Sequence, residues 1–314
     1  MKYMSTHRDK TGRPSPIYRD KTERFINGEI NTLANQQFAE FELDKVKYRV
    51  VEVISKESGE AMIYLVENND KQFILKLYFS GLIPPPNHEI MEIVKQSAET
   101  NLFVKIFNHG FWTNPQTQEK HDYELLEYCT GNSLDQVKVH GNEKLLGEIA
   151  LRCAAALDLL HKNKIIHRDV KPSNFFFRNN DKDIENLMLA DFGVSVFADN
   201  SGKTTIDYQL RTNPYAAPET YTNNIEGKIE ISYKSDFFSL GMMLLILWDG
   251  EEIFKISERA LIKLKTEGKL LYPDNVGKRT LQLLMAITLK DPEKRAGFEE
   301  IMKWAKGETI YDLY

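Results

Sequence analysis

The stretch from residue 165 to residue 174, Ile-Ile-His-Arg-Asp-Val-Lys-Pro-Ser-Asn, carries side chains that suit phosphoryl transfer. Asp169 can act as a base, Lys171 can neutralise a phosphate oxygen, and Asn174 offers a neutral oxygen ligand to a hard metal ion. Phosphoryl transfer depends mostly on positioning and on neutralising charge, which such a set provides. The segment therefore predicts a catalytic loop that follows a short apolar pair.

Two further charged residues lie in or beside apolar segments. Lys76 falls within the sequence Phe-Ile-Leu-Lys-Leu, and it needs an anionic partner because an unpaired ammonium there would be costly. Asp191 follows the apolar residues 187–190 and precedes Phe192 and Gly193. A carboxylate at the end of a strand, with a glycine close behind it, suits a metal ligand on a segment that turns sharply.

Hydrophobic patterns indicate strands in the first part of the chain and helices in the second. Alternating and β-branched runs predict strands over residues 48–54, 62–67, 73–78, 104–109 and 123–128. Apolar residues at helical spacing predict helices over residues 88–98, 143–162, 235–248, 275–289 and 297–305. The helix over 235–248 is apolar almost all round, so we expect it in the middle of a helical lobe.

Composition bounds the class of protein. The chain has 314 residues, of which 42% are hydrophobic, and this suits one domain of two lobes. A net charge of -5 gives no reason to expect binding to nucleic acid or to a membrane. With 2 cysteines, no apolar run long enough to span a bilayer and no signal-like N-terminus, the sequence predicts a soluble, cytoplasmic protein.

Several segments resemble the motifs of the eukaryotic-type protein kinases. Residues 167–174 match the catalytic loop H-R-D-x-K-x-x-N, and residues 191–193 match the metal-binding segment. Residues 212–219, Thr-Asn-Pro-Tyr-Ala-Ala-Pro-Glu, resemble the end of the activation segment. In the family, the last glutamate of this segment pairs with a distant arginine, which Arg295 matches.

The resemblance covers roughly residues 46–306 and identifies the chain as a member of the serine/threonine protein kinases. It implies an α+β fold of two lobes. We expect a polar, partly flexible N-terminal extension over residues 1–45, a mainly β small lobe over residues 46–128 and a mainly α large lobe over residues 129–314. It also implies that Asp236, at the start of the central helix, holds the backbone of the catalytic loop.

The resemblance implies ATP and Mg²⁺ as cofactors and protein serine or threonine hydroxyls as acceptors. Asp169 would orient and deprotonate the acceptor hydroxyl, and Lys171 would steady the γ-phosphate. Asn174 and Asp191 would ligate Mg²⁺. Lys76 would hold the α- and β-phosphates and would pair with a glutamate on the helix that follows its strand.

Two glutamates of that helix compete for the pairing with Lys76. Glu89 places Ile93 four residues later, at an apolar core position, whereas Glu92 would place Gln96 there. We therefore predict Glu89 as the partner.

The remaining predicted contacts surround the nucleotide. The phosphate loop has one glycine where the family has three, and its contacts would come from Ser58, Gly59, Ala61 and Ile63. Adenine would lie among Ile74, Leu126, Glu127, Cys129 and Phe176, with backbone groups of Glu127 and Cys129 facing it. Ile74 replaces the usual alanine and Phe176 the usual leucine, so we expect a tighter, flatter adenine site.

Two other functions are alternatives. A pseudokinase that acts as a binding or scaffold module would explain the degenerate glycine-rich loop. A small-molecule phosphotransferase of the aminoglycoside or choline kinase type would share the small lobe and a similar metal site. That class lacks the segment ending at Glu219 and its distant partner Arg295, and both residues argue against it.

A hypothesis about regulation follows from Arg168, which precedes Asp169 and can receive a phosphate. Hydroxyl residues lie in the activation loop nearby. We expect autophosphorylation at Thr204 or Thr205.

Overall fold

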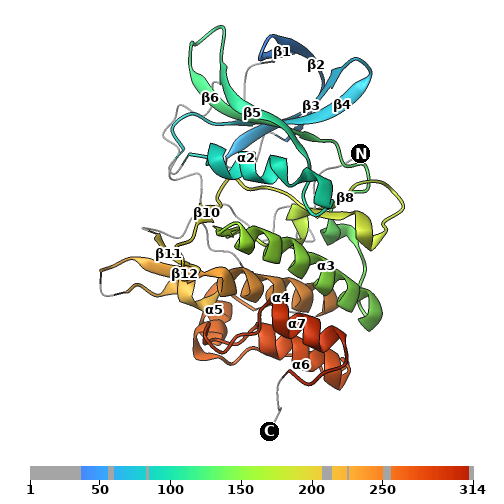
Figure 1. Cartoon of the computed structure of the whole chain (residues 1–314), viewed down its shortest axis with the longest axis vertical. Helices are drawn as coiled ribbons and strands as arrows, with labels where there is room; N and C mark the ends of the chain where they lie inside the picture. The colour runs from blue at the N-terminus through green and yellow to red at the C-terminus, as the bar shows by residue number, and fades with distance from the viewer. Residues whose placement is uncertain are drawn as a thin grey trace.

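The computed structural model describes residues 37–55, 60–82, 85–206, 214–224, 226–249 and 256–310. Within these ranges, a sheet and one helix form a small lobe above a larger helical lobe (Figure 1). In the same ranges, no helix is both long and apolar enough to cross a membrane.

The small lobe is built on an antiparallel sheet with the strand order β1-β2-β3-β4-β6-β5. Its strands are β1 (Glu40–Leu43), β2 (Val46–Ser55), β3 (Ala61–Asn68), β4 (Lys71–Tyr78), β5 (Ile106–Thr113) and β6 (Lys120–Glu127). One face buries a cluster that includes Tyr64, Leu75, Leu77 and Trp112. The predicted strands are confirmed, although β5 begins later and extends further than expected.

Strand β1 lies inside the segment that was predicted to be an N-terminal extension. Phe41 and Leu43 are buried, whereas the residue before each of them is exposed. Phe41 packs edge-on against Trp112, with ring centroids 5.2 Å apart. The small lobe therefore includes β1, and a boundary at residue 45 is too late. Residues 1–36 of the predicted extension lie outside the described residues.

Helix α2 (His88–Gln96) packs beside β5. Asn87 caps it, because its side-chain oxygen accepts hydrogen bonds from two backbone N–H groups of the first turn, at 3.0 and 3.3 Å. Ile90, Met91 and Val94 are its buried residues. The face that α2 turns toward the interior is therefore apolar.

The large lobe contains helices α3 (Glu143–Lys162), α4 (Tyr233–Asp249), α5 (Glu258–Glu267), α6 (Lys278–Ile287) and α7 (Phe298–Ala305). Short strands pair in twos: β7 (Ile165–Ile166) with β10 (Val196–Phe197), β8 (Phe175–Phe177) with β9 (Leu187–Leu189), and β11 (Lys203–Ile206) with β12 (Ile229–Ser232). The 3-10 turns are η3 (Ala98–Thr100), η4 (Leu134–Gln136), η5 (Pro172–Asn174), η6 (Ile184–Asn186) and η7 (Pro218–Tyr221).

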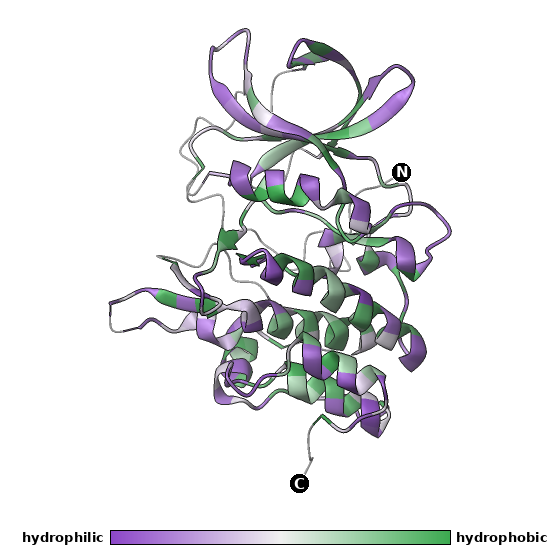
Figure 2. Ribbon diagram, in the orientation of Figure 1, coloured by the Kyte–Doolittle hydropathy of each residue, from purple (hydrophilic) through white to green (hydrophobic). Residues whose placement is uncertain are grey.

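Helix α4 forms the centre of the large lobe. All of its side chains over residues 235–246 are buried, and it packs against α3 and α6. Figure 2 shows hydrophobic residues along much of its length. The predicted central position of this helix is confirmed, and helix α3 has the predicted bounds. Helix α5 was not predicted from the hydrophobic pattern.

Candidate active site

The catalytic loop connects β7 to β8 and brings three predicted side chains together. The ammonium of Lys171 lies 2.6 Å from Asp169 Oδ2. The amide nitrogen of Asn174 donates to the same carboxylate oxygen at 3.1 Å and to the backbone oxygen of Asp169 at 2.8 Å. Asp169 is thus held by two neighbours on its own loop, which orients a carboxylate where a general base would stand.

Asp236 on helix α4 fixes the backbone of this loop. Its carboxylate accepts hydrogen bonds from the N–H groups of His167 and Arg168, at 2.8 and 2.9 Å, and from His161 Nε2 at 2.9 Å. Burial opposes the charge of Asp236, but the hydrogen bond and charge of His161, with further support from His167, place its pKa below the ordinary value. The predicted contact of Asp236 with the catalytic loop is confirmed.

One backbone hydrogen bond and one side-chain contact join the catalytic loop to the segment that carries Asp191. The N–H of Ala190 donates to the backbone oxygen of Asn174 at 2.8 Å, and His167 Nε2 lies 3.1 Å from the backbone oxygen of Ala190. Arg168 and Asp191 both have positive φ angles, of 72° and 66°. Such angles are strained for residues with side chains. Here they occur at two turns, one in the catalytic loop and one shortly after β9.

Lys76 on β4 reaches the same place from the small lobe. Its ammonium lies 2.5 Å from Asp191 Oδ1, and the residue is 6% exposed. Burial alone would lower the pKa of Lys76, but the charges of Asp191 and Glu124 outweigh it and raise the pKa. The pKa of Asp191 is lowered, because the positive charges of Lys76 and Lys171 overcome the effect of its own burial.

The predicted pairing of Lys76 with Glu89 is wrong for this structure. Glu89 lies in the first turn of α2 and is exposed, because its N–H takes part in the Asn87 cap and its side chain points away from the core. Glu92, the other candidate, lies 3.1 Å from His109 Nε2. Lys76 forms its ion pair with Asp191 instead.

Glu124 on β6 is a buried acid that was not predicted from the sequence. It stands opposite Lys76 in the register of β4 and β6 and is 1% exposed. Tyr78 Oη donates a hydrogen bond to its carboxylate. Burial raises the pKa of Glu124, and the positive charge of Lys76 and the bond from Tyr78 work against that rise. The available signal was an acid placed directly before Leu125 and Leu126, inside the predicted strand over residues 123–128.

The predicted adenine contacts come together at the junction of the lobes. Leu126 and Phe176 pack against a small buried cluster that contains Cys129. Ile74 stands opposite Leu126 on the neighbouring strand. Burial raises the pKa of the Cys129 thiol to about 12, so this residue is a small apolar contact and not a reactive thiol.

Three other predicted nucleotide residues have defined places. The carboxylate of Glu127 lies 2.9 Å from Arg178 Nε. The backbone N–H of Glu127 donates to the backbone oxygen of Lys105 at 2.9 Å. Ala61 is fully buried, and Ile63 stands opposite Lys76 in the β3–β4 register. The predicted contacts at Ser58 and Gly59 lie outside the described residues.

The donor set suits a magnesium ion that is shared with phosphate. Asp191 supplies a carboxylate, and Asn174 supplies its amide oxygen because its amide nitrogen donates to Asp169. Among the described residues, no group of three or more His, Cys, Asp or Glu side chains could hold a metal ion. Mg²⁺ commonly takes few protein ligands and completes its shell with phosphate oxygens and water, which fits these two residues.

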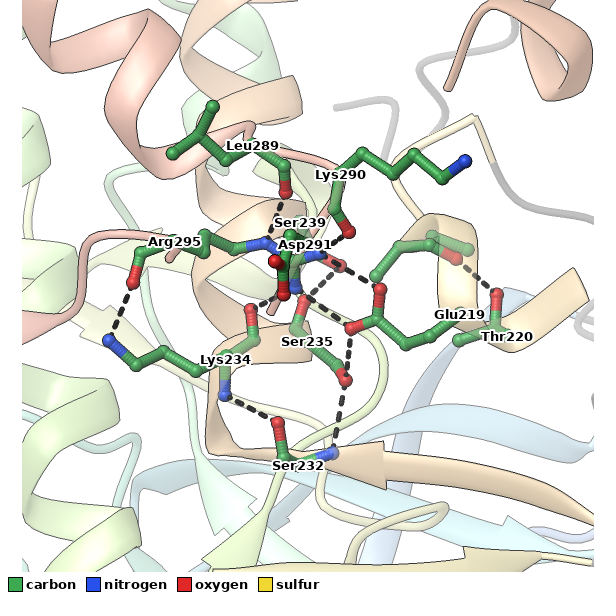
Figure 3. Close-up of polar contacts among 12 residues, drawn as sticks. Glu219, Thr220, Ser232, Lys234, Ser235, Ser239, Leu289, Lys290, Asp291 and Arg295 are labelled. Carbon is green, nitrogen blue, oxygen red and sulfur yellow. Dashed lines mark hydrogen bonds and ion pairs between the residues drawn. The ribbon is translucent and has the colours of Figure 1, made fainter. Parts of the chain in front are cut away.

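The end of the activation segment is fixed to the large lobe by Glu219 and Arg295 (Figure 3). Two guanidinium nitrogens of Arg295 bind the Glu219 carboxylate at 2.8 and 2.9 Å, and Ser235 Oγ donates to it at 2.7 Å. From α5, the buried Lys265 donates to the backbone oxygen of Ala216 at 2.8 Å. The predicted pair of Glu219 and Arg295 is confirmed.

The hydroxyl residues proposed for autophosphorylation belong to a paired strand. Thr204 and Thr205 lie on β11, opposite Ile231 and Glu230 of β12, and Thr205 is exposed. Arg168 donates to the backbone oxygen of Val194 at 3.0 Å. These threonines therefore do not lie in an irregular loop, and their phosphorylation stays a prediction.

Comparison with known proteins agrees with this geometry. Residues 91–305 match the model of the protein kinase domain. The chain belongs to this family, and the two-lobed α+β fold expected from the sequence is confirmed.

Similar proteins come from distant organisms. The chain is 38% identical over 198 residues to the MAP kinase kinase MKK1/SSP32 of Saccharomyces cerevisiae, covering 59% of this chain and 35% of that protein. It is 31% identical over 178 residues to mitogen-activated protein kinase kinase 9 of Arabidopsis thaliana, covering 57% and 55%. It is 29% identical over 207 residues to eukaryotic translation initiation factor 2-alpha kinase 1 of Plasmodium falciparum, covering 62% and 12%. The chain thus spans about half or less of the length of each of these relatives.

Proposed function

We propose that the protein transfers the γ-phosphoryl group of ATP to serine or threonine hydroxyls of protein substrates, with Mg²⁺. The observation that carries this proposal is the arrangement around Asp169. Lys171 and Asn174 contact its carboxylate at 2.6 and 3.1 Å, on a loop whose backbone is bound by Asp236. Membership of the protein kinase family and the names of its relatives support the same activity.

In this proposal, each side chain has one task. Asp169 accepts the proton of the substrate hydroxyl, and Lys171 turns from Asp169 to an oxygen of the γ-phosphate. Lys76 holds the α- and β-phosphates. Asp191 and Asn174 hold Mg²⁺, which would neutralise charge on the phosphates and orient them.

Serine and threonine are the proposed acceptors because Lys171, together with Thr212, follows the serine/threonine-type pattern. We also propose a cytoplasmic location. The thiols of Cys129 and Cys153 are buried and form no disulfide, which agrees with a reducing compartment.

The test is transfer of γ-labelled phosphate to a generic protein substrate in the presence of Mg²⁺, followed by phosphoamino-acid analysis. Label on serine and threonine is expected, and label on tyrosine alone would overturn the assignment of acceptors. Asp191→Asn should abolish transfer. Asp274→Asn, at an exposed aspartate, is the matched control and should leave transfer unchanged.

The competing function is a pseudokinase that binds a partner protein. It predicts no transfer by wild type under any of these conditions and no change in melting temperature when ATP and Mg²⁺ are added. Absence of transfer by wild type would overturn the proposed activity, and absence of the thermal shift as well would favour the pseudokinase.

A further inference from the structure

Lys76 needs an anion other than Asp191 if the proposed function is correct. In the structure, Asp191 is its ion-pair partner at 2.5 Å. The proposed function gives the Asp191 carboxylate to a magnesium ion, whose two positive charges then compete with the ammonium for the same oxygens. Once Mg²⁺ binds Asp191, the attraction between Asp191 and the buried Lys76 becomes weaker. The ammonium then needs another anion to stabilise its charge and to fix its position.

Helix α2 does not supply that anion. Its interior face consists of Ile90, Met91 and Val94, all buried. Glu89 is exposed, and Glu92 is bound to His109 of β5 at 3.1 Å. The first turn of α2 is anchored to the sheet as well, because His88 Nε2 lies 2.7 Å from Asp122 of β6. The helix is therefore attached through its polar side, with its acids turned outward.

The sheet supplies an acid where the helix does not. Glu124 is directly opposite Lys76 across β4 and β6, and directly opposite residues of adjacent strands point to the same face. Its carboxylate is 1% exposed and accepts a hydrogen bond from Tyr78. Leu126, two residues later on β6, packs beside Phe176 at the predicted adenine site. Because side chains alternate along a strand, Glu124 lies on the same face as Leu126.

Tyr78 completes the arrangement. It stands two residues after Lys76 on β4, and the Lys76 ammonium lies 4.6 Å from the centre of its ring. A Cβ atom on Gly193 would come within 2.7 Å of Tyr78 Oη, so the tyrosine packs tightly on the segment that follows Asp191. Tyr78 thus orients the Glu124 carboxylate and contacts both the lysine and the metal-binding segment.

We propose that Glu124, carried by the sheet, is the positioning residue that holds Lys76 toward the nucleotide phosphates when Asp191 binds metal. Tyr78 fixes the Glu124 carboxylate in that role. The position of helix α2 then does not control the charge balance of Lys76. This inference rests on the proposed function, because it assigns the transfer reaction to the same site.

The test compares Glu124→Gln with wild type by steady-state transfer kinetics and by the dissociation constant of ATP with Mg²⁺. The amide keeps the size of the side chain and can still accept the bond from Tyr78, so the variant is expected to fold with a melting temperature close to that of wild type. We expect kcat/KM to fall about 100-fold, because a displaced lysine misaligns the phosphates. Glu99→Gln, at an exposed acid, is the matched control and should behave as wild type.

A second variant adds a glutamate at the interior face of α2. Met91→Glu in the Glu124→Gln background places the acid on the helix, and recovery of transfer would show that the missing element is a negative charge near Lys76. Unchanged kcat/KM in Glu124→Gln would overturn the proposal. So would a loss of about 100-fold in Glu89→Gln, because that result would return the role to the helix.

The two proposals fail in different ways. If wild type binds ATP with Mg²⁺ but transfers nothing, the proposed function fails, and the effect of Glu124→Gln on the dissociation constant still decides the role of Glu124. If Glu124→Gln changes neither binding nor transfer while wild type is active, the role of Glu124 alone is refuted.

Discussion

Arg295 binds both carboxylate oxygens of Glu219, at 2.8 and 2.9 Å, across a separation of 76 positions in the chain. The arginine is 1% exposed and also donates to the backbone oxygens of Leu289, Lys234 and Lys290. This pair attaches the end of the activation segment to the last part of the large lobe. The role of this pair is structural, because neither residue is among those assigned to phosphoryl transfer.

Replacing Arg295 by methionine should therefore destabilise the protein with little direct effect on chemistry. The change removes the charged partner of Glu219, which keeps the hydrogen bond from Ser235, and it takes a donor from three carbonyl groups. Removing one partner of a buried pair typically costs roughly 3–5 kcal/mol. The free energy of unfolding, measured with urea, should fall by about that amount. Lys294→Met is the neighbouring control with a 74% exposed side chain, and it should change stability by less than about 0.5 kcal/mol. A loss below about 1 kcal/mol in Arg295→Met would contradict the structural role.

Asp236→Asn should disorder the catalytic loop. Its carboxylate accepts three hydrogen bonds through its two oxygens. An asparagine has an amide nitrogen in place of one oxygen, and that nitrogen cannot accept a hydrogen bond from an N–H group. We expect a loss of roughly 1–3 kcal/mol in the free energy of unfolding and a large loss of transfer activity. Circular dichroism with urea and the transfer assay measure the two effects.

The same residue predicts a pH dependence. The pKa of Asp236 is lower in the folded protein than in the unfolded chain, so its stabilising charge is present above the unfolded value of about 4 and is lost as the pH falls. The stability difference between wild type and Asp236→Asn should shrink below about pH 4. A difference that grows on acidification would contradict this sign.

Lys265 predicts a second dependence of stability on pH, which arises from burial of a cation and not from stabilisation of an anion. It is 1% exposed and donates to Ala216 and to Tyr221 Oη, at 2.8 and 3.2 Å. Burial lowers the pKa of Lys265 to about 7, against the opposing charges of Glu258 and Glu219. An unfolded lysine titrates near pH 10.4, so between about pH 7 and that value the unfolded state binds more protons. Stability must therefore rise with pH over this range.

The measurement compares wild type with Lys265→Met by urea unfolding at several pH values. The stability of wild type relative to the variant should rise by roughly 1.4 kcal/mol per pH unit above about pH 7.5. Lys263→Met, where the side chain is 73% exposed, should show no such trend relative to wild type. A flat difference for Lys265→Met would mean that this lysine stays charged in the fold.

Ile74 should restrict what binds beside the adenine. It is half-buried opposite Leu126, next to the cluster that contains Cys129 and Phe176. Inhibitors that need space at this position should bind Ile74→Ala at least about 10-fold more tightly than wild type, because overpacking costs roughly 1–3 kcal/mol. An inhibitor without the bulky group serves as the control and should change little. Equal binding of the bulky inhibitor to both proteins would contradict the prediction of a tight site.

The sequence indicated that Asp169, Lys171 and Asn174 lie close together, because they fall within one short segment, and the structure brings their side chains into contact. The pair of Glu219 and Arg295 is distant in sequence but was predicted through the two motifs that carry it. In both cases the positions of the residues in the motifs were enough to predict which side chains would be in contact.

The sequence did not predict which acid faces Lys76. Helical spacing alone favoured Glu89, but the Asn87 cap places that residue in an exposed first turn. Glu124 stands opposite Lys76 in the register of β4 and β6, and that register depends on the pairing of the whole sheet. Strand β1 was missed for a different reason: its alternation of acids with Phe41 and Leu43 is short, and it shows as a strand only when paired with β2.

In the proposed function, Asp169 performs chemistry at a site that binds ATP and Mg²⁺ through other residues. This role is tested most directly by measuring nucleotide affinity and phosphoryl transfer together in Asp169→Asn. The dissociation constant for ATP with Mg²⁺ should stay close to that of wild type, while the rate of transfer falls roughly 10²- to 10⁴-fold. Transfer by Asp169→Asn at the wild-type rate would contradict this role.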